Sequence, residues 1–288
     1  MAAGAREGGV SARRAPVILL HGFAQHAGSW DEVAEGLRQR GFKAIAPELA
    51  ELPGAASGDD LSGVCAAVDS LCRSVARQEG RLPVLTGYSM GGRIALETVL
   101  RSIDGASSPD EPCPSRGAAG AFGLPCCALV LESAGVGPET EGDRLRFAER
   151  NVGWARRIRE QGVEAFMDWW EELPLFASQR DLPADDRERL RAGRIDNDPG
   201  ILSMQLAAWG AQHQTLCPKA WGLLRGLLEE GFPLAYFAGA LDGKYSRVAE
   251  AVAELPGATA VIFPNVGHNV HLEDPSAFVE RLCGILPA

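Results

Sequence analysis

The stretch Gly87-Tyr88-Ser89-Met90-Gly91-Gly92 joins an apolar run over residues 82–86 to a helical pattern over residues 93–102. A strand that turns directly into a helix at Gly-x-Ser-x-Gly holds its serine in a strained backbone conformation, and the glycines leave room for the turn. The turn exposes the Ser89 hydroxyl and directs the Met90 N–H to where negative charge would develop. A chance match is the alternative, but the strand and helix on either side make it the weaker interpretation. The stretch therefore predicts a nucleophile-type serine.

Short apolar runs alternate with helical patterns along the rest of the chain. The runs predict strands over residues 16–20, 42–46, 82–86, 127–132, 233–238 and 259–264. Helical spacing of apolar side chains predicts helices over residues 31–39, 59–78, 93–102, 246–254 and 275–282. Alternation of this kind is typical of an α/β fold, in which helices cover both faces of a mostly parallel sheet.

The segment 138–231 interrupts this alternation because it lacks strand patterns. Its helical spacing covers residues 144–158, 163–172, 184–192 and 201–209, and it holds five of the six tryptophans, Trp154, Trp169, Trp170, Trp209 and Trp221. Such aromatics can line a pocket, although core packing is their commoner use. We interpret 138–231 as a helical cap inserted into a core formed by 16–137 and 232–288. Residues 1–15 are expected to be a disordered tail, and 104–125 a long surface loop.

The bulk composition limits the partners of the protein. Its 288 residues carry a formal charge of −10, and this net negative charge repels nucleic acid and anionic membrane surfaces. No segment is long and apolar enough to cross a bilayer, and the N-terminus lacks the apolar core of a secretion signal. The seven cysteines lack zinc-ribbon spacing. We therefore expect free thiols, no metal, no nucleic acid, no membrane insertion and a cytoplasmic location.

A second candidate loop, His21-Gly22-Phe23, follows the first predicted strand. Where a serine turn of this type occurs, one oxyanion-binding N–H comes from the residue after the serine and the other from a loop at a neighbouring strand end. The sequence therefore predicts Phe23 and Met90 as the two backbone donors, with Gly22 permitting close approach. The alternative is an ordinary strand-end turn.

A histidine and a carboxylate complete the set in the chain order serine, acid, histidine. His268 follows the last predicted strand, and Gly267 before it permits a tight turn back towards the serine. His271 is the competing base. Asp242 follows the strand over 233–238, where its carboxylate can hold the histidine Nδ1–H. We therefore assign His268 as the base and Asp242 as the acid.

Two other carboxylates are weaker candidates for the acid. Asp274 is too close to His268 in the chain and, before Pro275, fits a helix N-cap better. Glu132 ends an earlier strand. A solvated surface carboxylate is the alternative for each of them.

Two cations lie close to these residues in the chain. Arg93, one helical turn after Ser89, could direct its guanidinium at a substrate carboxylate, with a surface arginine as an equal alternative. Lys244, two residues after Asp242, is similarly ambiguous.

These features together resemble one branch of the α/β-hydrolase superfamily, the 2-succinyl-6-hydroxy-2,4-cyclohexadiene-1-carboxylate synthases of menaquinone biosynthesis. The similarity runs from about Pro16 to the C-terminus. The serine turn alone is shared by many hydrolases, but the other matching stretches are more selective. The stretches are Leu20-His21-Gly22-Phe23, the serine turn through Arg93-Ile94-Ala95, Phe166-Met167-Asp168-Trp169-Trp170, Leu173-Pro174-Leu175-Phe176-Ala177-Ser178, Gly239 to Tyr245, and Gly267-His268-Asn269-Val270-His271.

The resemblance implies an α/β-hydrolase fold that works as a lyase. Enzymes of this branch act on 2-succinyl-5-enolpyruvyl-6-hydroxy-3-cyclohexene-1-carboxylate, remove the proton alpha to the succinyl ketone and expel pyruvate by 2,5-elimination, without a metal or organic cofactor. Ser89, held by His268 and Asp242, would then act as a base towards carbon. The substrate is a small multiply charged anion, which gives Arg93 a purpose.

The resemblance also implies substrate contacts, for which the sequence offers candidates. An arginine-rich stretch over 144–150 differs in register from the cap arginines of the family, so Arg146 and Arg150 are both candidates for a second carboxylate anchor. In that family an acidic residue is common before the aspartate that matches Asp242, and this sequence has Ala240-Leu241 there. The remaining candidates for pocket contacts are His21, Tyr88, Trp169 and Lys244.

Two other functions stand as alternatives. A carboxylesterase or carbon–carbon bond hydrolase would use the same fold, and a non-catalytic binding module would keep the pocket. The complete Ser/Asp/His set argues against a binding module. Arg93 and the cap arginines argue against a hydrolase of neutral esters, whose pocket would favour an apolar lining.

Overall fold

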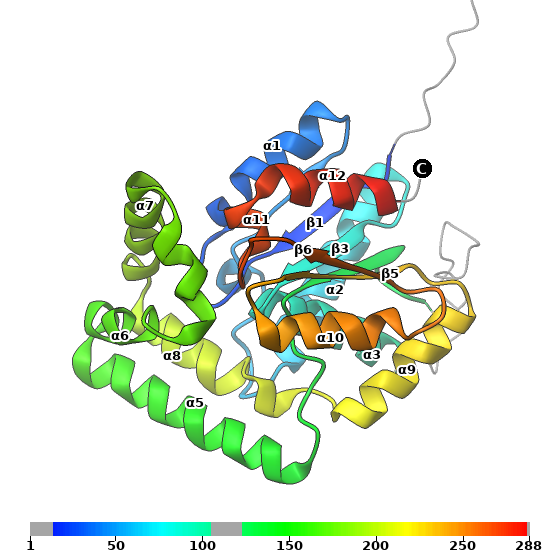
Figure 1. The fold of residues 1–288 in the computed structure, drawn as a ribbon. Helices are drawn as coiled ribbons and strands as arrows, with labels where there is room; N and C mark the ends of the chain where they lie inside the picture. The colour runs from blue at the N-terminus through cyan, green and yellow to red at the C-terminus, as the bar shows by residue number, and fades with distance from the viewer. Residues whose placement is uncertain (1–13, 105–122, 287–288) are drawn as a thin grey trace, which may run out of the picture.

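A single parallel sheet forms the centre of the computed structural model, which describes residues 14–104 and 123–286. The strand order is β2-β1-β3-β4-β5-β6, so the order reverses at β1. Ligands of such sheets bind at the carboxyl ends of the strands beside this reversal. The strands are β1 (Val17–Leu20), β2 (Ala44–Ile45), β3 (Val84–Tyr88), β4 (Ala128–Glu132), β5 (Leu234–Gly239) and β6 (Thr259–Phe263) (Figure 1).

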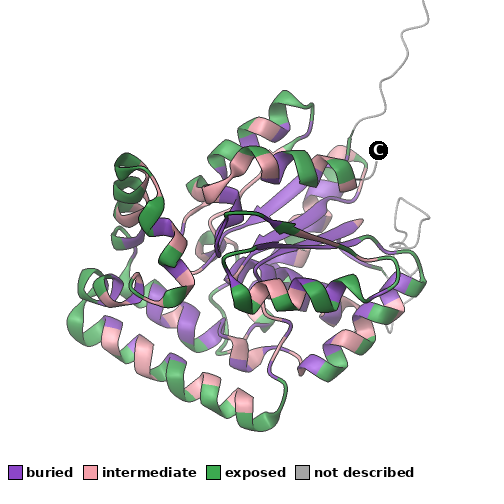
Figure 2. Ribbon diagram, in the orientation of Figure 1, coloured by how far each residue is buried: buried purple, intermediate pink, exposed green. Residues whose placement is uncertain are grey.

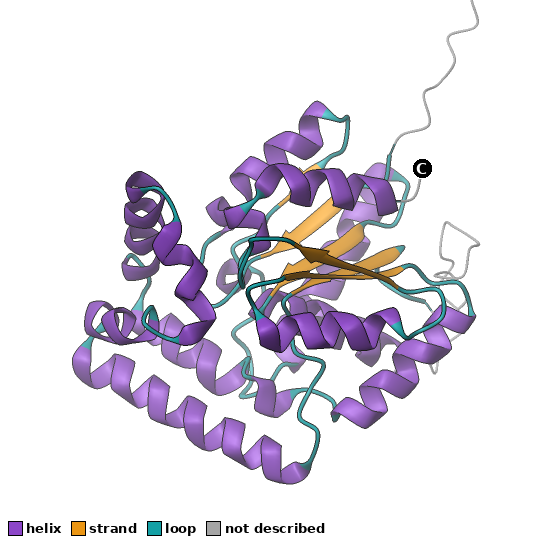
Figure 3. Cartoon of the chain, viewed as in Figure 1, coloured by secondary structure: helices purple, strands orange, loops and turns teal. Residues whose placement is uncertain are grey.

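Helices cover both faces of the sheet (Figures 1 and 3). Side chains alternate along β1, so Val17 and Leu19 join one apolar cluster while Ile18 and Leu20 join the other. The first cluster lies under α1 (Asp31–Gln39) and α12 (Pro275–Ile285). The second lies under α2 (Ser62–Glu79), α3 (Met90–Asp104), α9 (Cys217–Glu229) and α10 (Gly243–Ala253). Burial of the strands between these helices is visible in Figure 2.

The chain between β4 and β5 adds a further helical layer (Figure 1). This layer has its own apolar cluster, in which Ile158, Phe166 and Leu202 are buried together with Ala24 from the loop after β1. Its elements are α5 (Glu141–Gln161), α6 (Val163–Trp170), η3 (Pro174–Asp181), α7 (Ala184–Ile195), α8 (Pro199–Ala208) and η4 (Ala211–His213). The remaining short turns are η1 (Ala27–Trp30), η2 (Leu49–Glu51) and α11 (Val270–Glu273).

The predicted fold class is confirmed, with the helix α9 and the short α11 missed. The sequence did not distinguish α9, which lay inside the predicted cap over 138–231. Leu224 and Leu227 of this helix are buried in the same cluster as the sheet. We therefore propose that the cap ends before Cys217 and that α9 belongs to the core.

The predicted tail and loop fall largely outside the described residues. Residues 1–13 and 105–122 are not described, which covers most of the tail over 1–15 and of the loop over 104–125. Within the tail, Arg14 lies over the Phe42 ring at 4.6 Å and Ala15 is buried. These two residues therefore contact the core.

Side-chain caps fix several helix starts near the site. Asp274 accepts a hydrogen bond from the Ala277 N–H at 3.0 Å, which matches its predicted N-cap role. Thr140 and Asp143 form a capping box at the start of α5. Among the described residues, the six cysteines that can be placed are free thiols. No helix in the described part of the chain is long and apolar enough to cross a membrane.

Candidate active site

The serine turn has the strained geometry that the sequence predicts. Ser89 has a φ of 50°, between the end of β3 and the start of α3. Its N–H donates to the Glu132 carbonyl at 2.8 Å. A Cβ at Gly87 would lie 2.4 Å from the Gly91 carbonyl oxygen, and one at Gly91 would lie 2.3 Å from that of Leu20. Glycine is therefore required at both positions for the backbone to turn here.

Ser89, His268 and Asp242 form one hydrogen-bonded chain. The Ser89 Oγ lies 3.2 Å from His268 Nε2, and His268 Nδ1 lies 2.7 Å from Asp242 Oδ2. The histidine and aspartate side chains are buried. The other carboxylate oxygen of Asp242 accepts from the N–H groups of Lys244 and Tyr245, each at 3.2 Å. An anionic Asp242 thus receives Nδ1–H and leaves Nε2 free to accept the serine proton.

The competing candidates for base and acid lie elsewhere. The side chains of His271 and Glu132 bond to each other and not to the Ser89 hydroxyl, with His271 Nδ1 at 2.7 Å from Glu132 Oε2. Asp274 caps α12. Of the alternatives weighed from the sequence, the structure thus brings only His268 and Asp242 to the serine.

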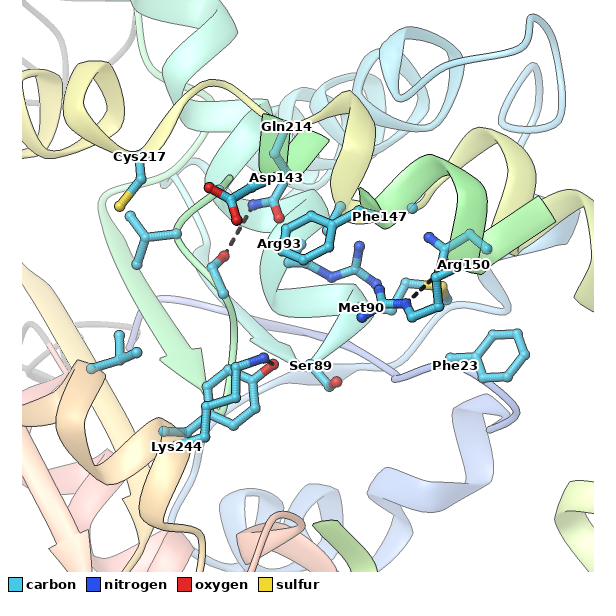
Figure 4. Close-up of a pocket in the computed structure, with 18 of the residues that line it drawn as sticks. Phe23, Ser89, Met90, Arg93, Asp143, Phe147, Arg150, Gln214, Cys217 and Lys244 are labelled. Atoms are coloured by element: carbon cyan, nitrogen blue, oxygen red, sulfur yellow. Dashed lines mark hydrogen bonds between the residues drawn. The ribbon is translucent and has the colours of Figure 1, made fainter. Parts of the chain in front are cut away.

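The two backbone amides predicted to bind an oxyanion, those of Phe23 and Met90, belong to residues that line one cavity. Met90 is the first residue of α3, so its N–H has no acceptor within the helix. Phe23 lines the same pocket as Ser89 and Met90 (Figure 4). The described part of the chain contains no acceptor for the Phe23 N–H. Both amides are therefore available to an oxygen that gains negative charge.

His21 does not line the pocket, contrary to the sequence prediction that it contacts substrate. It is buried, its Nδ1 lies 2.9 Å from the Gly22 carbonyl oxygen, and its Nε2 accepts from the Leu49 N–H at 3.3 Å. Burial lowers the pKa of His21, which favours the neutral ring with its proton on Nδ1. His21 bonds the carbonyl oxygen of the peptide that joins Gly22 to Phe23. The N–H of the same peptide is that of Phe23. The side chain thus orients the candidate oxyanion donor.

A cavity of about 560 Å³ opens above Ser89 between the sheet edge and the cap. Arg93 of the core helix α3, Arg150 of the cap helix α5 and Lys244 of α10 reach it from different elements (Figure 4). Arg247 of α10 also lines it. Its aromatic lining includes Phe147, Trp154, Trp170, Trp221 and Tyr245. The cavity therefore combines aromatic walls with positive charge next to the serine.

Arg93 is a desolvated cation without a carboxylate partner. Its Nη1 donates to the Trp209 carbonyl at 3.1 Å, and no carboxylate of the described residues forms an ion pair with it. Burial lowers the pKa of Arg93 to about 10, with the charge of nearby Arg150 acting in the same direction. A guanidinium in such surroundings leaves most of its donors unused, and an anionic ligand would satisfy them.

The structure separates the two cap arginines that the sequence left open. Arg150 lines the pocket, and its guanidinium lies 4.7 Å from the centre of the Trp154 ring. Arg146 is exposed, pairs with Asp143 and does not line the pocket. Arg150 is therefore the candidate anchor, and the prediction for Arg146 is not supported.

Two predicted aromatic contacts also lie outside the pocket lining. Tyr88 is buried beneath the site, with its ring centre 5.3 Å from that of His268 and 4.9 Å from that of His271. Trp169 packs on Trp154 at 5.7 Å, behind the wall. Side chains alternate between the two faces of a strand, and Tyr88 lies on the face that is turned away from the pocket. Successive residues of a helix point in different directions, so Trp170 faces the pocket and Trp169 does not.

Sequence reasoning missed several lining residues. Trp170, Tyr245 and Arg247 line the cavity, but only Trp170 belongs to a stretch that had been singled out as an aromatic cluster. Arg247 lies three residues after Lys244 and so on the same side of α10, which is a signal that could have found it. In the described part of the chain, no group of three or more His, Cys, Asp or Glu residues could hold a metal ion.

A family model for the alpha/beta hydrolase family matches residues 17–281. The chain belongs to the alpha/beta hydrolase family. Within this family, a Salmonella agona protein named 2-succinyl-6-hydroxy-2,4-cyclohexadiene-1-carboxylate synthase is 30% identical over 273 residues, covering 94% of this chain and 93% of that protein. A Bacillus subtilis relative is 31% identical over 264 residues, and the alignment covers 91% of this chain and 86% of that protein. The family resemblance drawn from the sequence is thereby confirmed.

Solved structures of other family members share the fold. The structure of MenH from S. aureus has a TM-score of 0.77 at 23% identity, covering 97% of this chain and 96% of that one. A thermophilic esterase from Thermogutta terrifontis has a TM-score of 0.68 at 19% identity, covering 94% and 88%. Since a structure described as an esterase is also this similar, the alpha/beta hydrolase fold alone does not separate lyase from esterase.

Proposed function

We propose that the protein is a lyase that converts 2-succinyl-5-enolpyruvyl-6-hydroxy-3-cyclohexene-1-carboxylate into 2-succinyl-6-hydroxy-2,4-cyclohexadiene-1-carboxylate and pyruvate. The relatives that carry this synthase name over almost the whole chain support the proposal. The observation that carries it is Arg93, a half-buried cation in the cavity above Ser89 that forms no ion pair with a carboxylate of the described residues. A substrate with several carboxylates supplies what this cation lacks.

Ser89 acts as the base in this proposal. His268 Nε2 accepts the Ser89 proton, and Asp242 keeps the histidine in the required tautomer. The serine oxygen then removes the proton alpha to the succinyl ketone. The electron pair of that C–H bond moves into the ring, the double bond shifts, and the C–O bond to the enolpyruvyl group breaks. The departing enolpyruvate takes up a proton and becomes pyruvate.

The backbone amides of Met90 and Phe23 stabilise the intermediate charge. Removal of the proton places negative charge on the ketone oxygen, in the same way as attack on a carbonyl would. Donors fixed by α3 and by the His21-Gly22 loop do not have to reorganise as this charge develops. Amides of this kind contribute about 3 kcal/mol each where a single donor has been removed from a comparable site.

The cations bind the substrate carboxylates. Arg93 is the anchor beside the serine, and Arg150 on the facing cap helix is the second. Lys244 and Arg247 can reach a further carboxylate from the α10 wall. This focused positive charge is needed because the net charge of −10 repels an anion at long range.

Pyruvate release from the enolpyruvyl substrate tests the proposal. The purified protein is given this substrate, and pyruvate is measured with a coupled dehydrogenase. In parallel it is given short p-nitrophenyl esters, which report a carboxylesterase. Pyruvate release with weak ester hydrolysis is the expected result. Rapid ester turnover without pyruvate release would contradict the lyase assignment and favour the esterase.

A further inference from the structure

Two buried residues that the proposed mechanism does not use form a second histidine–carboxylate pair. Glu132 Oε2 lies 2.7 Å from His271 Nδ1, and Glu132 Oε1 accepts the His271 backbone N–H at 3.0 Å. Both side chains are fully buried. The Glu132 carboxylate thus binds both the ring and the backbone N–H of His271.

Aromatic rings enclose the side chain of His271. It stacks on Trp30 at 3.7 Å with an interplanar angle of 18°, and the Tyr88 ring meets it edge-on. Within the described chain its Nε2 has no hydrogen-bond partner. Glu132 Oε2 offers an acceptor to an Nδ1–H, whereas an Nε2–H would be buried without one, so the hydrogen-bond geometry favours the Nδ1–H tautomer.

Glu132 also contacts the serine turn. Its backbone oxygen accepts the Ser89 N–H at 2.8 Å, while its side chain holds His271, three residues after His268. Between the two histidines lies the Tyr88 ring, which contacts both. The end of β4 therefore binds the serine turn on one side and the histidine loop on the other.

The histidine loop has one further carboxylate, which belongs to the loop itself. Glu273 accepts from the N–H groups of Gly267 at 2.7 Å and Asn269 at 3.3 Å, on either side of His268. These bonds shape the loop but do not tie it to the sheet. Of these two carboxylates, only Glu132 lies on a strand, so it ties the loop backbone to the strand end that binds the Ser89 N–H, while Asp242 holds the His268 ring.

We propose that Glu132 and His271 are a positioning pair that sets the distance between Ser89 Oγ and His268 Nε2. The inference rests on the part of the proposed function in which these two atoms exchange a proton, and not on the identity of the substrate. Displacing a reacting group by about an ångström can cost about a hundredfold in rate. Loss of the pair should therefore lower the chemical rate and leave substrate binding unchanged, since neither side chain lines the pocket.

Two variants remove the pair in different ways. Glu132→Gln keeps the acceptor for the His271 N–H, but its amide can face Nδ1 only as a donor, which forces the ring into the unfavourable tautomer. His271→Phe keeps the stack on Trp30 and removes the Nδ1–H. Because Phe fills the same space, this variant still tests the proposal if the Gln variant does not fold. Phe278→Leu is the matched packing control, since Phe278 packs on Trp30 at 5.6 Å and on His271 at 6.2 Å between ring centres, and its replacement leaves both hydrogen bonds between Glu132 and His271 in place.

Each variant is assayed by pyruvate release and by its rate of inactivation with a fluorophosphonate, which phosphonylates an activated serine whatever the natural substrate is. We expect both pair variants to lose about tenfold or more in kcat and in phosphonylation rate, with KM within about twofold. The double variant should be no slower than the slower single one, because the two residues act as a unit. Phe278→Leu should lower Tm and leave both rates within about twofold.

Three results would overturn the positioning role: folded pair variants that phosphonylate at the wild-type rate, additive losses in the double variant, or an equal loss in Phe278→Leu. A wild-type protein that phosphonylates but releases no pyruvate would contradict the proposed substrate instead. The phosphonylation rates would then still decide whether Glu132 and His271 position His268.

Discussion

The Arg93 guanidinium reaches from the core helix α3 to the cap, where it donates to the Trp209 carbonyl at 3.1 Å. The Trp209 side chain is fully buried in the apolar cluster that covers the sheet, which fixes this residue and the carbonyl oxygen that receives the bond. A single carbonyl does not neutralise a guanidinium, and four of its five N–H donors remain for a ligand. This contact therefore holds the charge in place without cancelling it.

Replacing Arg93 should separate activity from stability. We expect Arg93→Met to lower kcat/KM for the anionic substrate about a hundredfold, because it removes a charged anchor beside the serine. Tm should change little, since Arg93 is only half-buried and Met fills similar volume. Steady-state kinetics and thermal unfolding measure the two effects. Equal losses with neutral esters would show that Arg93 does not act as a carboxylate anchor.

The two cap arginines should behave differently. Arg150→Met is expected to raise KM about tenfold, because this side chain lines the pocket at the cap wall. Arg146→Met is its matched control, as Arg146 lies on the same helix and is exposed. It should change KM by less than about twofold. Comparing KM for the two variants tests the choice of Arg150 as the anchor. A larger rise in KM for Arg146→Met would make Arg146 the anchor instead.

Removing the serine hydroxyl should abolish turnover and leave the fold intact. Ser89→Ala is expected to reduce kcat by about a thousandfold or more, since the proton acceptor is lost while the oxyanion amides remain. Circular dichroism and Tm should match wild type, because alanine tolerates the turn almost as well as serine. A variant that keeps substantial pyruvate release would mean that another group acts as the base.

His21 should influence the rate through the peptide that it holds. His21→Phe keeps a ring in the buried site but removes the donor to the Gly22 carbonyl, so the Phe23 N–H is less well fixed. We expect kcat to fall about tenfold with little change in KM. Stability should fall by about 1–3 kcal/mol, because the Leu49 N–H also loses its acceptor. An unchanged kcat in the folded variant would contradict the orienting role.

The sequence by itself determined the strand and helix pattern and the serine turn. Apolar spacing and glycine placement are local properties, because they act through neighbouring residues on the backbone. For the same reason, the chain order and strand-end positions were enough to select Ser89, Asp242 and His268. Glycine is required at positions 87 and 91 because a side chain there would collide with backbone atoms, and the short Gly-x-Ser-x-Gly motif records this requirement.

Only the tertiary structure decided which side chains face the pocket. Tyr88 and Trp169 belong to matching stretches, yet one lies under the site and the other behind its wall. Arg146 and Arg150 are one helical turn apart and cannot be ranked until α5 is placed over the sheet. The pairing of Glu132 with His271, which lie 139 positions apart, was equally inaccessible. The direction of a side chain depends on how its helix or strand packs against elements that are distant in the sequence. A local sequence pattern does not determine that packing.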